Sequence, residues 1–142
     1  MAAYTGKCHC GELRFVYTTS ITPSEWTVRS CQCSFCRAHG VRATRDPSGS
    51  VRFEAGDAIV RYEFGQRTAQ FLICGRCGVY VAAVMASPRG RFATVNVNAL
   101  YPAPEGLPAA RPVTYDEEAP AQRIARREQG WTPVIDPFPP RP

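Results

Sequence analysis

The chain has 142 residues, of which 44% are hydrophobic and 11% aromatic, and its formal net charge is +5. This composition excludes global disorder, and the length predicts one domain with an ordinary core. Thirteen prolines and eleven glycines favour short elements over long helices.

Short strands are predicted along most of the chain. Residues 13–17 and 26–30 alternate roughly between apolar and polar types, as half-buried strands do. Further runs are rich in β-branched and aromatic residues and are bounded by Gly, Pro, Asp or Ser; they cover residues 51–54, 59–64, 69–73, 79–85 and 92–97. The sequence therefore predicts a mainly β fold of short antiparallel sheets.

One short C-terminal helix is predicted after Asp116. Pro120 fits its first turn, Ile124 and Glu128 follow at helical spacing, and Gly130 ends it. From residue 133 onward the chain is rich in proline, which predicts an extended tail without regular sheet pairing. We expect residues 1–132 to form the domain and residues 133–142 the tail.

The compartment follows from what the chain lacks. No N-terminal apolar stretch has the length of a signal peptide, and the longest uncharged apolar run, residues 79–86, is too short to cross a bilayer. We therefore expect a cytoplasmic protein with no membrane partner. The cytosol keeps thiols reduced, so seven cysteines, an odd number, predict metal binding or catalysis rather than disulfides.

The cysteines fall into three groups, and this grouping is the strongest feature of the sequence. The groups are Cys8-His9-Cys10-Gly11, Cys31-Gln32-Cys33-Ser34-Phe35-Cys36 and Cys74-Gly75-Arg76-Cys77-Gly78. Two cysteines separated by one or two residues allow a tight turn to aim both sulfurs at one ion, and a following glycine lets the backbone bend back. Zinc is the expected ion.

Tetrahedral zinc takes four ligands, so seven cysteines can complete one site and leave three. Cys31, Cys33 and Cys36 lie within six residues and can converge on one ion from a single loop. This favours an open, catalytic three-cysteine site. The remaining pairs would form a closed structural site: Cys8, Cys10, Cys74 and Cys77. Two zinc ions per chain are expected, and the second would be the labile one.

Spacing alone leaves alternatives open. Cys74 and Cys77 can instead join two cysteines of the middle group, and His9 or His39 can complete the open shell. A single zinc with the remaining cysteines as packed thiols is a further alternative.

Several arginines bear on the choice of partner. Arg37 and Arg76 lie beside cysteines, where a guanidinium would offset the negative charge of zinc thiolates. Arg123, Arg126 and Arg127 form the only basic cluster, for which a solvated basic surface is the simpler interpretation; with the net charge, the cluster also supports the alternative of a nucleic-acid partner.

With these motifs the chain resembles the glutathione-dependent formaldehyde-activating enzyme family, which also includes centromere protein V. The three cysteine motifs occur in the family's order, and Arg37 and Gly40 follow the second motif. The resemblance implies a β-tent fold with zinc knuckles over residues 1–132. It also implies a structural zinc on the first and third motifs and a catalytic zinc on the second.

The resemblance further implies a carbon-sulfur lyase that acts on S-hydroxymethylglutathione, the adduct of glutathione and formaldehyde. The partner would be a small thiol such as glutathione. Three positions depart from the family pattern: Gln32 stands where His is frequent, Ile73 replaces a common Phe, and Tyr115 stands where a late His is often found. Trp131 is a candidate for the pocket mouth. The alternative function is a zinc-stabilised binding module for nucleic acid or protein.

Overall fold

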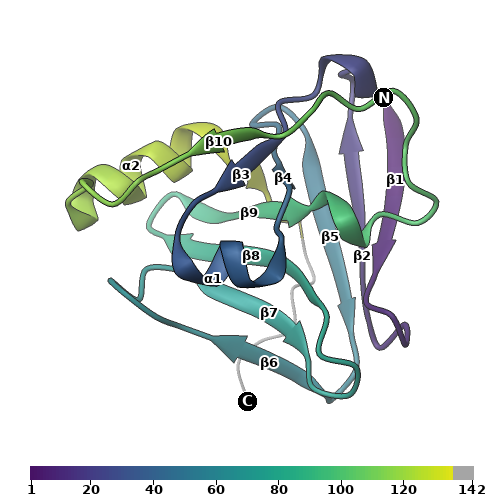
Figure 1. The fold of residues 1–142 in the computed structure, drawn as a ribbon, viewed down its shortest axis with the longest axis horizontal. Helices are drawn as coiled ribbons and strands as arrows, with labels where there is room; N and C mark the ends of the chain where they lie inside the picture. Colours follow the sequence, from purple (N-terminus) through teal and green to yellow (C-terminus); the bar gives the residue numbers. More distant parts are fainter. Residues whose placement is uncertain (136–142) are drawn as a thin grey trace.

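The computed structural model describes residues 1–135, and its strands form two sheets whose strands run nearly across one another (Figure 1). The smaller sheet has the order β1 (Ala2–Lys7), β2 (Leu13–Thr19), β5 (Ser50–Ala55). The larger sheet has the order β10 (Arg111–Val113), β3 (Arg29–Cys31), β4 (Ala43–Thr44), β9 (Gly90–Asn96), β8 (Tyr80–Ser87), β7 (Gln70–Cys74), β6 (Ile59–Tyr62), and β11 (Thr132–Pro133) pairs with β9.

Two α-helices and two short 3-10 helices complete the described elements. They are α1 (Ser34–His39), α2 (Pro120–Gly130), η1 (Pro23–Glu25) and η2 (Val97–Ala99). The strand pairs are antiparallel except for β10 with β3, which is parallel. The predicted mainly β fold of antiparallel sheets with a short C-terminal helix is therefore confirmed.

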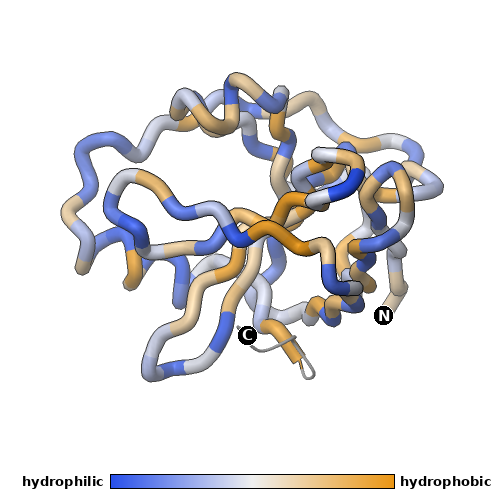
Figure 2. The backbone as a smooth tube through the Cα atoms, turned by 90° about the horizontal axis from the view of Figure 1, so that it is seen from below, coloured by the Kyte–Doolittle hydropathy of each residue, from blue (hydrophilic) through white to orange (hydrophobic). Residues whose placement is uncertain are grey.

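The hydrophobic core lies between the two sheets. Alternate residues of β2 are buried, and the ring of Phe15 lies 6.2 Å from that of Phe53 on β5. From the larger sheet, β8 contributes an unbroken buried run from Tyr80 to Met85. Burial on both faces explains why this strand reads as a continuous apolar stretch instead of an alternating one. Figure 2 shows hydrophobic residues concentrated where the chain crosses the centre and hydrophilic ones on the outer loops.

The strand predicted over residues 26–30 differs from the observed strand β3, which spans Arg29–Cys31. The strand begins only at Arg29, because Trp26 closes η1 and its indole Nε1 donates a 2.9 Å hydrogen bond to the carbonyl of Ile21. The aromatic residue is buried as a core anchor, not as part of a ladder.

Two elements near the cysteines were not predicted. Strand β1 is mostly exposed and lies at the edge of its sheet, so its sequence lacks the apolar alternation that marks a strand. Helix α1 has only six residues and ends at Gly40, whose φ of 58° is left-handed. A helix this short has no readable period.

The chain beyond α2 returns to the sheets. Thr132 and Pro133 pair with β9, and the amides of Val134 and Ile135 donate to the carbonyls of Arg91 and Val51. The prediction that residues from 133 onward make no sheet pairing is therefore wrong for its first residues, because a two-residue pairing tolerates proline where a longer ladder does not. The rest of the predicted tail, residues 136–142, lies outside the described residues. Among the described residues, no helix is long and apolar enough to cross a membrane.

Candidate metal centres and active-site cavity

The first cysteine cluster joins the two sheets at one end. Cys8 and Cys10 lie in the turn between β1 and β2, while Cys74 ends β7 and Cys77 lies in the turn to β8. Their four sulfurs all lie within 4.8 Å of one another. The Sγ–Sγ separations are 3.7 Å for Cys8 and Cys10 and 3.6 Å for Cys10 and Cys74. A tetrahedron with zinc–sulfur bonds of 2.3 Å has edges of about 3.8 Å, so the donor set fits zinc.

Backbone amides surround these sulfurs. The amide of Leu13 donates to Cys8 Sγ at 3.3 Å, and the amides of Arg76 and Cys77 donate to Cys74 Sγ at 3.4 Å each. The turn that makes this possible ends at Gly78, whose φ of 80° strains any side chain. Such N–H donors stabilise thiolate sulfur, as a metal knuckle requires.

The second cluster is held by a single turn of chain. Cys31 ends β3, Cys33 caps the N-terminus of α1, and Cys36 lies in its first turn. The three sulfurs lie within 4.8 Å of one another, and the amide of Cys36 donates to Cys33 Sγ at 3.4 Å. Hydrogen bonds from the thiols of Cys31 and Cys36 lower the pKa of Cys33 to about 2. Three sulfurs that share negative charge suit a cation with one coordination position left for another ligand.

The structure places the two histidines outside both clusters of the described chain. His39 packs its ring on Phe35, with 4.5 Å between the ring centroids, and His9 is exposed. Cys74 and Cys77 meet Cys8 and Cys10, not the middle group. Of the arginines beside cysteines, Arg76 lies 4.0 Å from the carboxylate of Glu12.

The three-cysteine cluster lines a cavity of about 590 Å³. Its apolar wall comes from the larger sheet, from the loop between β6 and β7, and from the segment after α2. This wall includes Phe64, Phe71, Tyr80 and Trp131. Trp131, a candidate for the pocket mouth, lines this cavity and is buried. Tyr80 is buried and clusters with Cys36 and Val41, so the sulfurs have a dry apolar floor.

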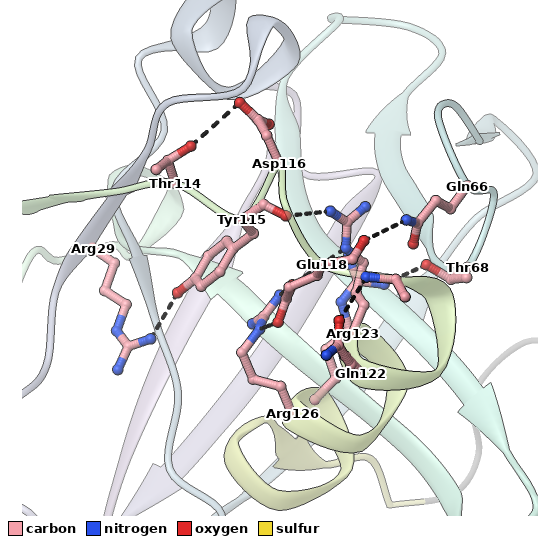
Figure 3. Close-up of polar contacts among 12 residues, drawn as sticks. Arg29, Gln66, Thr68, Thr114, Tyr115, Asp116, Glu118, Gln122, Arg123 and Arg126 are labelled. Carbon is pink, nitrogen blue, oxygen red and sulfur yellow. Dashed lines mark hydrogen bonds and ion pairs between the residues drawn. The ribbon is translucent and has the colours of Figure 1, made fainter.

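A second part of the cavity lining, the basic wall, is rich in arginine. It carries five arginines: Arg29, Arg45, Arg123, Arg126 and Arg127. Tyr115 is at its centre: its hydroxyl accepts a 2.7 Å hydrogen bond from Arg29, the guanidinium of Arg126 lies 3.6 Å from its ring, and its carbonyl accepts from Arg123 (Figure 3). Glu118 holds Arg126 at 2.7 Å and Arg123 at 3.4 Å.

Sequence reasoning missed the cavity's basic wall. It treated the cluster on α2 as a surface feature, whereas Arg127 is only 8% exposed and lies against the cavity. One signal was available. Arg29 lies two residues before Cys31, and residues two apart on a strand share a face.

The comparison with known families explains the cysteine motifs. The family model of the glutathione-dependent formaldehyde-activating enzyme matches residues 3–114. The chain belongs to this family. All seven cysteines lie in the matched range, while Tyr115 and α2 lie beyond it. A crystal structure of a Rhodobacter sphaeroides protein is similar to this chain, with a TM-score of 0.54 and 28% identity; the match covers 77% of this chain and 99% of that one.

Proposed function

We propose that the protein forms and cleaves the carbon–sulfur bond between a small thiol of the glutathione type and a small aldehyde such as formaldehyde. The observation that carries the proposal is the open cluster of three sulfurs on the wall of a 590 Å³ cavity. Membership of the formaldehyde-activating family supports the same reaction. Cavities of this volume suit small-molecule ligands.

Cys31, Cys33 and Cys36 would hold a zinc ion, and Cys8, Cys10, Cys74 and Cys77 a second, structural one. At a three-thiolate site zinc supplies a Lewis acid with a free coordination position. The closed site has no such position, so its role would be to tie the two sheets together.

The reaction needs no oxidant or reductant. The thiol sulfur forms a bond to the carbonyl carbon, the π bond of the carbonyl breaks, and the thiol proton passes to the carbonyl oxygen. The reverse steps release thiol and aldehyde. Because this addition also occurs slowly in water, the protein's contribution would be to hold the two reactants side by side and to favour the thiolate.

The cavity walls divide that work. The apolar floor formed by Phe71 and Tyr80 excludes water from the sulfurs, which strengthens electrostatic interactions there. The basic wall attracts an anionic thiol from solution. The arginine cluster that supported the alternative of a nucleic-acid partner belongs to this wall, so it does not favour a binding module.

The test is exchange spectroscopy of ¹³C-formaldehyde with glutathione, in which NMR measures how fast free aldehyde and adduct interconvert at equilibrium. Catalytic amounts of the zinc-loaded protein are expected to raise the exchange rate well above the buffer rate. A folded Cys33→Ser protein is expected to return the rate to that of buffer. Equal exchange with and without the zinc-loaded protein, over glutathione and several other thiols, would contradict the proposed function.

A further inference from the structure

The basic wall carries more positive charge than its own acids neutralise. Among the residues that line the cavity, five are arginines and the sole carboxylate is Asp116, which is exposed and accepts from Thr114 at 3.3 Å. The nearby carboxylate of Glu118 is already engaged by Arg123 and Arg126. Three arginines therefore lack an acidic partner in the described part of the chain: Arg29, Arg45 and Arg127.

Arg127 is the most informative of the three. Its side chain is nine-tenths buried, its Nη1 donates to Thr68 at 2.8 Å, and its guanidinium lies 4.6 Å from the ring of Trp131. Its buried Nε has no hydrogen-bond partner among the described residues. A buried cation with an orphan donor is costly unless an anion meets it. Burial, followed by the charges of Arg126 and Arg123, lowers the pKa of Arg127 to about 10.

Arg45 lines the same cavity. A β-carbon on Gly130 would stand 3.4 Å from its Cζ, so the guanidinium lies against the C-terminal end of α2. Burial and the neighbouring charge of Arg29 both lower the pKa of Arg45. The like charges of Arg29 and Arg45 repel one another more strongly where they are partly shielded from water, and an anionic ligand would offset that repulsion.

We infer that Arg29, Arg45 and Arg127 form a carboxylate-binding subsite, which restricts the substrates of the three-cysteine site to thiols that carry a carboxylate. This inference rests on the proposed function, because it assigns the substrate class of the same cavity. The planar guanidinium presents paired N–H donors that match the two oxygens of a carboxylate. The hydroxyl of Tyr115 accepts from Arg29 and so fixes one of these guanidinium groups in place.

Part of the subsite lies outside the range that matches the family. Arg127, Trp131 and Tyr115 all lie beyond residues 3–114, the range that matches the family. The metal-binding cysteines thus come from the shared part of the family, whereas part of the carboxylate subsite comes from outside it.

Binding of S-methylglutathione tests the subsite without using the reaction. This probe keeps both carboxylates of glutathione but has no free thiol, and in its dimethyl ester, a control of nearly the same shape, both carboxylates are neutralised and the amino group is kept. Calorimetry measures affinity, and the fluorescence of Trp131, which lines the cavity, reports where the probe binds. The zinc-loaded protein is expected to bind the free acid on the order of tenfold to a hundredfold more tightly than the diester, the range expected for charge-assisted hydrogen bonds.

Arg45→Gln is expected to remove most of that preference, and Arg89→Gln, a change in an exposed turn, to leave it intact. If Arg127→Gln fails to fold, Arg127→Lys is the second variant, because lysine keeps the charge but lacks the paired N–H donors of the guanidinium. It too is expected to lower the affinity for the free acid relative to the affinity for the diester. Equal affinities for acid and diester, or a preference that survives Arg45→Gln, would overturn the subsite. If the zinc-loaded protein prefers the free acid over the diester but does not accelerate the exchange of formaldehyde with glutathione, the proposed reaction is refuted and the subsite is not.

Discussion

The hydroxyl of Thr19 donates a 2.6 Å hydrogen bond to Oδ2 of Asp46, and both residues are almost fully shielded from solvent, at 0% and 3% exposed. The amide of Asp46 in turn donates to the hydroxyl of Thr132 at 2.9 Å. Thr19 ends β2 in the smaller sheet, whereas Thr132 begins β11 on the larger one. A buried polar network therefore links the two sheets beside their apolar core.

Removing the central carboxylate is expected to loosen that link. Asp46→Ala leaves the buried hydroxyl of Thr19 and the amide of Ser48 without their acceptor, because both donate to this carboxylate. The free energy of unfolding is expected to fall by about 2–3 kcal/mol, as measured by urea denaturation of the zinc-loaded protein. Asp57→Ala, at an exposed turn position, is the control and should change stability by less than about 0.5 kcal/mol. A loss for Asp46→Ala no larger than the control's would refute the network's role.

Gly6 is expected to tolerate no side chain. It pairs across the sheet with Phe15, whose ring lies over the glycine and would collide with any β-carbon placed there. Gly6→Ala is therefore expected to lower the free energy of unfolding by about 1–3 kcal/mol through overpacking. Ala3→Val adds bulk on an exposed position of the same strand and serves as the matched control. Thermal melts of the two variants decide the matter, and equal melting temperatures would be incompatible with the packing described.

The two cysteine clusters are expected to respond differently to the same substitution. Cys77→Ser breaks the closed site, and because its binding free energy contributes to folding, the protein is expected to unfold or precipitate. Cys33→Ser is expected to leave a folded domain that has lost the ion of the open site. Elemental analysis should find near two zinc ions per wild-type chain and near one in Cys33→Ser. A folded Cys77→Ser protein with both ions would contradict the division of roles.

Glu118 is expected to make stability depend on pH. Hydrogen bonds from Arg126 lower the pKa of Glu118 in the folded protein, and the charges of Arg126 and Arg123 act in the same direction. A depressed carboxylate pKa contributes stability that is present above the unfolded value of about 4.3 and is lost as pH falls through the folded value.

The test variant for this prediction is Glu118→Gln. Its matched control is Glu117→Gln, because the side chain of Glu117 is exposed. At pH 7 the first change is expected to cost about 1 kcal/mol of unfolding free energy, since the pair is partly buried and bidentate. The difference from wild type should shrink as pH falls below about 4. A deficit that stays constant down to pH 3 would argue against the ion pair as its cause.

The sequence allowed the metal clusters to be anticipated better than the cavity. The cysteine motifs carry ligand spacing that only a few turns satisfy, and the buried strands β2, β5 and β8 carry strong apolar patterns. The basic wall depends on the contacts of Tyr115 with Arg29 and Arg126, residues that lie up to 97 positions apart in the chain. No local pattern brings such residues together, because tertiary packing decides which face of α2 turns inward.

The short strand β3 fixes the distance between Arg29 and Cys31 in the cavity lining. Arg29 and Cys31 lie two residues apart on it, so both can line the cavity from one face, with about 7 Å of strand between them. The strand is held on both sides, by β4 and by β10, so this spacing does not change with loop movement. The proposed sulfur chemistry and the proposed anion recognition would therefore be held at this distance from each other. Deletion of Ser30 would turn Arg29 to the opposite face, while the cysteine motif itself stayed intact.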